Sequence, residues 1–339
     1  MTEDITSTTR SAIDPGTPTP APTGHDPGLA MVVTGLRSVA LDVVELTLEA
    51  PDGHELPAWE PGAHVDVVFP DDGLTRQYSL CGSPEDRHHY RIAVLREAEG
   101  RGGSRRIHDE VVVGSHLRVQ GPRNHFPLQP SPRYLFIAGG IGVTPLLPMI
   151  RASEKAGAQW RLVYGGRTDA SMSYLDELRP WGDHVTVWPE DRHGRIDLDG
   201  LLGTPVDETL IYCCGPEPLL AAVEERCSAW PRGSLNVERF SATLGADEGA
   251  NISFEVELRD SGKTLQVGAD QSILEVVTEA GVYVPTSCTE GTCGSCETPV
   301  LEGELDHRDV VLSEEEREAG QTMMICVSRA KCPRLVLEL

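Results

Sequence analysis

Three closely spaced cysteines constrain this chain more than any other feature of its sequence. Cys288, Cys293 and Cys296 follow the spacing C-x4-C-x2-C, and Cys326 lies further toward the C-terminus. This is the plant-type pattern for a [2Fe–2S] cluster. Two bridged irons need four thiolates on a fixed frame, so a loop that carries three of them has to wrap tightly. We therefore expect these four cysteines to be the metal ligands.

Two glycines in the same segment support that interpretation. Gly291 and Gly294 stand between the ligands, where the chain has to turn sharply and direct N–H groups toward the sulfurs. Zinc is the alternative, but structural zinc sites usually contain paired cysteine or histidine knuckles. Cys326 has no close partner other than Cys332, which lies too far along the chain for a knuckle. The pattern favours the iron–sulfur cluster.

The charge of the chain limits the classes of partner. The formal net charge is −24, and the sequence offers no basic stripe to neutralise phosphates, which argues against nucleic-acid binding. Between Asn251 and Leu339 there are 17 acidic residues against 7 basic ones. An acidic surface can serve solubility alone, but we expect this one to steer the docking of a basic partner protein.

The sequence also predicts a cytoplasmic monomer that does not enter a membrane. The start, Met1 to Asp14, is polar and lacks the apolar segment of a signal peptide. The longest apolar stretch, Tyr134 to Ile150, is interrupted by glycines and prolines, which indicates a buried strand and turn. The five cysteines outside the ligand set are expected to stay reduced.

At 339 residues the chain is long enough for several domains. Residues 1–28 are rich in Thr and Pro and are expected to be a disordered tail. Over 29–129, short apolar alternations such as Val39 to Leu48 are separated by turn residues, which predicts an antiparallel β-barrel.

Beyond the predicted barrel the pattern changes. Over 130–240 buried strands alternate with helices, which predicts a parallel, doubly wound sheet. A weakly patterned linker over 241–250 leads into 251–339, where we expect a hairpin and a helix capped by Ser272. The fold class is therefore multidomain α/β plus β.

Two short runs in the predicted barrel suit a flavin. In Arg76-Gln-Tyr-Ser79 the Tyr78 ring can cover the isoalloxazine, Ser79 can hydrogen-bond to its polar edge, and Arg76 can pair with a phosphate. The glycine turn Gly102-Gly-Ser104 offers N–H groups and a hydroxyl to a phosphate. An ordinary strand with an exposed arginine would look like the first run alone, but both runs in one barrel favour a flavin.

Two loops at one rim of the predicted parallel sheet suit a dinucleotide. Gly139-Gly-Ile-Gly-Val-Thr-Pro145 follows a buried strand and opens a helix, where the backbone can approach a pyrophosphate. It departs from G-x-G-x-x-G, and glycines at such turns often serve packing only. Cys214-Gly-Pro216 follows a later strand, so it lies at the same rim.

From residue 31 to residue 339 the sequence resembles the phthalate dioxygenase reductase-like family. These are FMN-containing iron–sulfur reductases that serve Rieske-type aromatic ring hydroxylases and O-demethylases. The resemblance rests on the runs quoted above, on their order and on the cysteine set. It implies an FMN-binding β-barrel over 29–129, a Rossmann-like NAD-binding domain over 130–240 and a β-grasp ferredoxin domain over 251–339.

The resemblance also assigns cofactor-binding residues and shows one departure. The assigned residues are Arg76, Tyr78, Ser79, Gly102, Gly103 and Ser104 for FMN, and Gly140, Gly142, Thr144, Pro145, Cys214, Gly215 and Phe240 on the nicotinamide side. No residue is expected to act as a general acid or base. The departure is Leu95, where a lysine or another polar residue is expected, and Arg96 is the candidate to replace it.

The implied function is an NADH-dependent reductase that passes electrons through FMN and the [2Fe–2S] cluster to a separate Rieske-type oxygenase or O-demethylase, typically in aromatic catabolism. A donor to a haem monooxygenase is the alternative. A module with a regulatory cluster is a third reading, and the flavin and nicotinamide runs argue against it. Arg167 could pair with a 2′-phosphate, which leaves NADPH open beside NADH. The sequence of this chain does not identify the substrate of the partner oxygenase.

Overall fold

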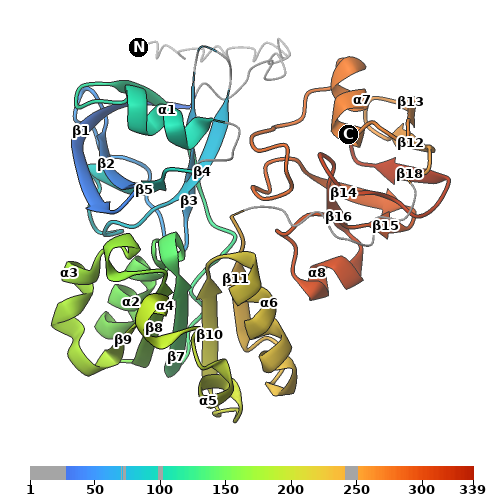
Figure 1. Ribbon diagram of the computed structural model, residues 1–339. Coiled ribbons are helices and arrows are strands. Elements are labelled where there is room, and N and C mark those ends of the chain that lie inside the picture. Colours follow the sequence, from blue (N-terminus) through green and yellow to red (C-terminus); the bar gives the residue numbers. More distant parts are fainter. Residues whose placement is uncertain (1–27, 70, 72–73, 98–101, 241–250) are drawn as a thin grey trace, which may run out of the picture.

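The computed structural model describes residues 28–69, 71, 74–97, 102–240 and 251–339. Its three larger sheets follow one another along the chain (Figure 1). We call residues 29–123 the barrel unit, 133–238 the parallel-sheet unit and 254–339 the C-terminal unit. The expected tail over 1–27 and the expected linker over 241–250 lie outside the described residues.

The barrel unit is a six-stranded antiparallel sheet in the order β4-β3-β6-β1-β2-β5. A bridge between Leu80 and Ile92 joins its two ends and closes the sheet. Buried apolar side chains, among them Leu46, Tyr90 and Val119, fill the interior, so the expected antiparallel barrel is confirmed. Its elements are β1 (Leu29–Ala40), β2 (Val43–Glu49), β3 (His64–Val68), β4 (Thr75–Ser79), β5 (His89–Leu95), α1 (Gly103–Glu110) and β6 (His116–Arg123).

The apolar run from Val39 to Leu48 spans the end of one strand and most of the next. Leu41 and Asp42 turn the chain there, and the run is divided between β1 and β2, which pair as an antiparallel hairpin. Asp42 adopts a left-handed φ of 59°, a conformation that aspartate tolerates better than most residues. Leu41 is 61% exposed at the turn, so its apolar character does not indicate a buried position.

The parallel-sheet unit has five strands in the order β11-β10-β7-β8-β9, and every pairing is parallel. The doubly wound sheet is confirmed, although β11 was not foreseen. The strands are β7 (Arg133–Gly139), β8 (Gln159–Gly166), β9 (Val185–Pro189), β10 (Thr209–Cys214) and β11 (Leu235–Glu238). The helices are α2 (Leu146–Lys155), α3 (Leu175–Leu178), α4 (Glu190–His193), α5 (Leu198–Leu202) and α6 (Glu217–Arg226), with 3₁₀ turns over Gly140–Val143, Asp169–Ser171, Arg179–His184 and Cys227–Ala229.

The C-terminal unit is a five-stranded mixed sheet in the order β13-β12-β18-β14-β16, with the small pair β15-β17. Ser272 begins α7 with a capping box: Ser272 Oγ accepts from the Glu275 N–H at 3.1 Å, and Glu275 Oε2 accepts from the Ser272 N–H at 2.7 Å. The predicted cap is confirmed. The elements are β12 (Phe254–Leu258), β13 (Lys263–Val267), α7 (Ile273–Glu279), β14 (Glu297–Glu302), β15 (Leu305–Asp306), α8 (Glu314–Ala319), β16 (Thr322–Met324), β17 (Arg329–Ala330) and β18 (Arg334–Leu337).

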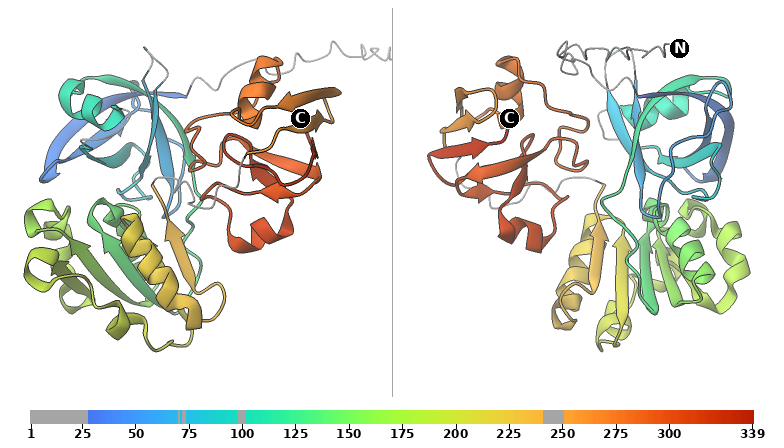
Figure 2. Two further views of the ribbon diagram at one scale, coloured as in Figure 1. Left: turned by 45° about the vertical axis from the view of Figure 1, so that its right-hand side comes forward. Right: turned by 180° about the vertical axis from the view of Figure 1, so that it is seen from behind.

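The three units differ in how they share their apolar interiors. Val43, Cys81 and Ala93 of the barrel unit pack into one core with residues of the parallel-sheet unit such as Phe136 and Tyr174. The core of the C-terminal unit is built only from its own residues. In both views of Figure 2 the C-terminal unit stands beside the barrel, and its orange loop reaches toward the barrel strands. No helix in the described ranges has the length and apolar character needed to cross a membrane.

Candidate redox site

All three units contribute to one cavity of about 140 Å³. The barrel provides strand β4 and the start of α1, the parallel-sheet unit provides a loop, and the C-terminal unit provides the cysteine loop over 286–296, which we call the cluster loop. The lining includes Arg76, Tyr78, Ser79, Gly102, Gly103, Ser104, Ile141, Thr144, Phe240, Cys288 and Thr292. The runs that the sequence assigned to flavin, nicotinamide and cluster therefore meet at one place.

Strand β4 and the turn before α1 pack together as a flavin phosphate site would require. A Cβ added at Gly103 would lie 2.5 Å from Arg76 Cγ, so only glycine lets the turn approach the arginine so closely. Gly102 has a left-handed φ of 90°. Burial raises the pKa of Tyr78, so its hydroxyl stays protonated at neutral pH. These residues fit a flavin whose ring meets Tyr78 and whose phosphate meets Arg76.

The structure shows where Leu95 and Arg96 lie relative to the cavity. Leu95 lines the cavity as an apolar wall. Arg96 donates to Asp109 Oδ1 of α1 at 2.7 Å, and it is not among the residues that line the cavity. Arg96 therefore does not take the place of the polar residue expected at Leu95.

The two loops assigned to the dinucleotide pack directly against each other. They follow β7 and β10, which are parallel neighbours. A Cβ at Gly142 would lie 2.3 Å from Cys214 O, and one at Gly215 would lie 3.0 Å from Gly139 Cα. These glycines are thus required for packing, whatever they bind. Gly140 has a φ of 55° and open space where a Cβ would point, so it is the glycine of this loop most available to a ligand.

Thr144 and Pro145 complete that loop. Thr144 is buried, and its hydroxyl donates to Ile141 O at 3.0 Å, which fixes the turn before helix α2. Pro145 immediately precedes α2, where its missing N–H costs nothing. The side chain of Phe240 is at the cavity and is 47% exposed.

The sequence analysis missed an acid in this site. Glu238, the last residue of β11, faces two assigned residues: Cys214 Sγ donates to Glu238 Oε2 at 3.8 Å, and Ser79 also hydrogen-bonds to its carboxyl. Burial raises the pKa of Glu238 to about 8, against the effect of those hydrogen bonds. Its position two residues before Phe240 was the available signal, but β11 itself was not predicted.

The four predicted metal ligands lie together and are buried. Their thiols form one connected group, in which Cys288 contacts Cys293 and Cys326, and Cys326 also contacts Cys296. Four thiolates gathered in this way fit the needs of a [2Fe–2S] cluster. Hydrogen bonds from Cys293 and then Cys326 lower the pKa of Cys288, which favours its thiolate.

The backbone of the cluster loop also fits an iron–sulfur cluster. The N–H groups of Glu290 and Thr292 point at Cys288 Sγ at 3.3 and 3.4 Å. Gly291 and Gly294 both have a left-handed φ of 70°, as the sequence suggested. Among the residues that the structure describes, no group of three or more His, Cys, Asp or Glu has an arrangement that could hold a single metal ion.

Polar side-chain contacts hold the cluster loop against the barrel, and no sequence pattern predicted them. Ser287 Oγ donates to Asp66 Oδ2, and Thr292 Oγ1 donates to Gln77 Oε1 at 3.2 Å. Each contact joins a neighbour of a cysteine ligand to a barrel strand. The loop that carries the cluster is thereby held beside the strand assigned to the flavin.

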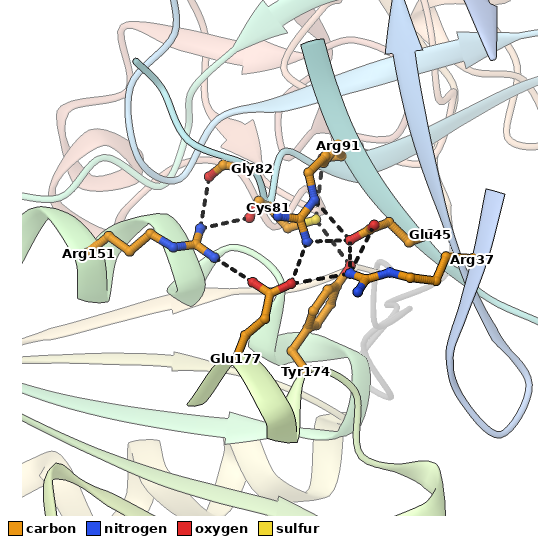
Figure 3. Close-up of polar contacts among 8 residues, drawn as sticks. All are labelled: Arg37, Glu45, Cys81, Gly82, Arg91, Arg151, Tyr174 and Glu177. Carbon is orange, nitrogen blue, oxygen red and sulfur yellow. Dashed lines mark hydrogen bonds and ion pairs between the residues drawn. The ribbon is translucent and has the colours of Figure 1, made fainter. Parts of the chain in front are cut away.

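An ion-pair network holds the barrel and the parallel-sheet unit together (Figure 3). Glu177 of α3 accepts from Arg91 at 2.7 Å and from Arg37 at 3.2 Å, both on barrel strands, and from Arg151 of α2 at 2.8 Å. Arg151 also donates to Cys81 O at 3.1 Å, just after strand β4. The helix that follows the glycine loop is therefore tied to the end of the flavin strand.

Comparisons with known proteins show which domains and which family this chain matches. Residues 256–331 match the model for the 2Fe-2S iron-sulfur cluster binding domain, and residues 136–225 match that for the oxidoreductase NAD-binding domain. The chain is 43% identical over 301 residues to phenoxybenzoate dioxygenase subunit beta of Ectopseudomonas oleovorans, which covers 88% of this chain and 93% of that protein.

A second relative and two solved structures are also similar to this chain. Phthalate dioxygenase reductase of Burkholderia cepacia is 38% identical over 321 residues, which is 93% of this chain and 98% of that protein. A structure of phthalate dioxygenase reductase superposes with a TM-score of 0.67 over 92% of this chain. An intact type IV self-sufficient cytochrome P450 monooxygenase is 48% identical with a TM-score of 0.86, and the match spans 92% of this chain but only 41% of that one.

Proposed function

The chain belongs to the phthalate dioxygenase reductase-like family, and from that premise we propose that it is the NADH-dependent reductase component of an oxygenase system. When bound, FMN would accept a hydride from NADH and the [2Fe–2S] cluster would carry single electrons onward. The observation that supports this most is the shared cavity, where Tyr78, Phe240 and the ligand Cys288 line one space.

The residues of the chain have separable tasks in this proposal. Arg76 and the N–H groups of the 102–104 turn bind the FMN phosphate, and Tyr78 and Ser79 hold the ring. Gly140, Thr144 and the Cys214 loop receive the nicotinamide dinucleotide at the rim of the parallel sheet. Glu238 keeps a proton close to Ser79 and Cys214 at neutral pH, because its pKa is raised to about 8.

The cluster ligands form the exit of the electron path. Cys288 lies at the cavity, and the C-terminal unit would present the cluster to a partner. The surplus of 17 acidic over 7 basic residues between Asn251 and Leu339 supports docking of a basic surface there. Glu297 and Glu316 lie within electrostatic reach of His125, which packs against the cluster loop at Gly294. We also expect a monomer in the cytoplasm, where the thiols stay reduced.

The identity of the acceptor has two candidates. A Rieske-type oxygenase or O-demethylase is favoured by relatives over nearly their full length, which include a vanillate O-demethylase oxidoreductase of a Pseudomonas species. A haem monooxygenase is favoured by the TM-score of 0.86 to the self-sufficient cytochrome P450, of which this chain covers about two fifths. Offering the reduced protein a Rieske oxygenase or a P450 haem domain, in separate assays, distinguishes them.

The reductase proposal itself is tested with the purified, flavin- and cluster-replete protein. We expect NADH-dependent reduction of cytochrome c, used as an artificial acceptor. A replete sample that oxidises no NADH with this acceptor would rule the proposal out. Replacing NADH by NADPH in the same assay tests the cofactor preference. Arg167, which is exposed just after β8, is the residue that would pair with the 2′-phosphate of NADPH.

A further inference from the structure

The two contacts of the barrel unit with its neighbours differ in kind. Toward the parallel-sheet unit the barrel shares an apolar core and the Arg–Glu network. Toward the C-terminal unit no apolar core cluster of the described residues is shared. The hydrogen bonds Ser287–Asp66 and Thr292–Gln77 are two direct links there between side chains of the cluster loop and the barrel strands. Removing two hydroxyl groups would therefore act on the position of the cluster loop with little effect on the rest of the protein.

Asp66 directs its carboxylate toward the cluster loop, where the barrel unit meets the C-terminal unit. It lies in the middle of β3 with no exposed surface, and Arg123 of β6 donates to the same Oδ2 that accepts from Ser287. The arginine holds the carboxylate in place on the outer face of β3, opposite the barrel core that Val65 and Val67 enter. A buried, charged acceptor makes a stronger hydrogen bond than a neutral one, and its direction is fixed.

Gln77 is the cross-strand partner of Asp66 and also belongs to the flavin strand. The two residues are paired in the β3–β4 register, and Gln77 stands between Arg76 and Tyr78. Its Oε1 accepts from Thr292, the residue before the ligand Cys293. One strand thus carries both the residues assigned to the flavin and an attachment for the cluster loop.

A third contact lies at Gly294. A Cβ added at Gly294 would lie 2.5 Å from the His125 ring, so the loop touches this side chain as closely as glycine permits. His125 in turn stacks on His64 of β3, with ring centroids 5.6 Å apart. The cluster loop is therefore seated at three points along its length: Ser287, Thr292 and Gly294.

We propose that Asp66 and Gln77 are positioning residues for electron transfer, which seat the cluster loop at the flavin cavity through Ser287 and Thr292. This inference rests on the proposed function. The rate of electron transfer falls steeply with distance, so a loop that leaves its seat would slow reduction of the cluster. The transfer from NADH to the flavin, which takes place at the parallel-sheet side of the cavity, would continue unchanged.

The test removes the two hydroxyls from the cluster loop and leaves the barrel intact. The variants are Ser287→Ala, Thr292→Val and both together, made in the flavin- and cluster-replete protein. Thr286→Val is the matched control, since the Thr286 hydroxyl donates only to Val284 O within its own segment, at 3.0 Å. Asp66→Asn approaches the same contact from the barrel side, alone and combined with Ser287→Ala.

Two measurements report separately on the contact between loop and barrel and on electron transfer. Hydrogen exchange of the amides in 284–295, measured without NADH, reports how often the loop leaves the barrel. Anaerobic stopped-flow mixing with NADH reports bleaching of the flavin and reduction of the cluster as separate phases. Loss of a hydrogen bond to a charged acceptor corresponds to a change of roughly tenfold in the docking equilibrium.

We expect Ser287→Ala to speed exchange in this segment and to slow cluster reduction, each by up to about tenfold. The double variant should show a larger effect, and flavin bleaching should stay at the wild-type rate in Ser287→Ala, since Ser287 is not among the residues that line the cavity. In the exchange of 284–295, Asp66→Asn should add little on the Ser287→Ala background, because residue 287 then has no hydroxyl left to donate to it. Its weakened pairing with Arg123 acts on the barrel in both backgrounds. Thr286→Val should behave as wild type.

The opposite results are equally clear. Unchanged exchange in the double variant would overturn the inference, as would a slower cluster reduction that is fully explained by a shifted midpoint potential of the cluster. Failure of NADH to bleach the wild-type flavin would refute the proposed function instead. The exchange measurement would still decide whether these contacts seat the loop.

Discussion

Glu177 is the residue through which the ion-pair network of Figure 3 crosses between units, and we predict the outcome of replacing it by glutamine. It is the acceptor that α3 offers to the barrel arginines Arg37 and Arg91, and it also accepts from Arg151 of its own unit. Glu177→Gln keeps the shape of the side chain and removes its charge. The local excess of positive charge then rises by one.

The structure bounds the magnitude of this effect. Each arginine keeps another acceptor in the variant: Arg37 keeps Glu45 at 3.1 Å, Arg91 keeps Glu45 at 3.0 Å, and Arg151 keeps the carbonyl oxygens of Cys81 and Gly82. No guanidinium is therefore left without a partner. Glu177 is 28% exposed, so solvent screens its charge in part. We expect a loss of about 1–2 kcal/mol in the free energy of unfolding.

The pH dependence gives the prediction a second, independent readout. Burial acts to raise the pKa of Glu177, but the hydrogen bond and charge of Arg91, together with the charge of Arg151, lower it overall. Because the folded-state pKa lies below the unfolded one, the stabilisation is present above the unfolded pKa and is lost as the pH falls through the folded value. The difference between wild type and variant should therefore vanish under acid conditions.

Urea unfolding at several pH values measures both quantities, with Asp176→Asn as the matched control. Asp176 is the neighbouring carboxylate of α3, is 89% exposed and pairs only with Arg179 among the ion pairs of the described residues. We expect this control to lie within about 0.5 kcal/mol of wild type. The reasoning is refuted if Glu177→Gln is no less stable than Asp176→Asn at pH 7.

Three further predictions address the site. The folded-state pKa of Glu238, about 8, lies above the unfolded value, so wild type should lose stability as the pH rises toward and through 8; Glu238→Gln should show a flatter dependence of Tm on pH, and an unaltered pH profile would contradict the burial of this acid. Cys326→Ser should abolish the visible absorption of the cluster while NADH still bleaches the flavin, whereas a variant that retains a full cluster would remove Cys326 from the ligand set. Reduction of the partner oxygenase should slow markedly between 50 and 300 mM salt, roughly as screening of exposed charges requires, and a salt-independent rate would exclude electrostatic docking.

The features that local sequence could predict are those encoded within a few residues. The cysteine spacing, the capping box at Ser272 and the strand-to-helix loop at 139–145 each combine neighbouring residues with one physical requirement. The structure brings the assigned flavin residues and Cys288 to one cavity, although their individual roles stay predictions. The apolar pattern did not reveal the turn at Leu41 and Asp42, because an exposed leucine has the same apolar character as a buried strand residue.

What the sequence could not reveal depends on pairs that are distant along the chain. Ser287 and Asp66 are separated by 221 positions, and Glu177 and Arg37 by 140. Glu238 gains its raised pKa only because β11 folds beside β10 and buries the carboxyl next to Cys214. An acid in a hydrophilic stretch reads as a surface residue until the sheet order is known.

The central claim is that electrons from NADH reach the cluster through the flavin within this one chain. An anaerobic titration of the replete protein with NADH, followed by absorption and by electron paramagnetic resonance, tests it most directly. We predict that the flavin bleaches and that the rhombic signal of a reduced [2Fe–2S] cluster grows in the same sample. A flavin that is fully reduced by NADH while the cluster stays oxidised and silent would contradict the account.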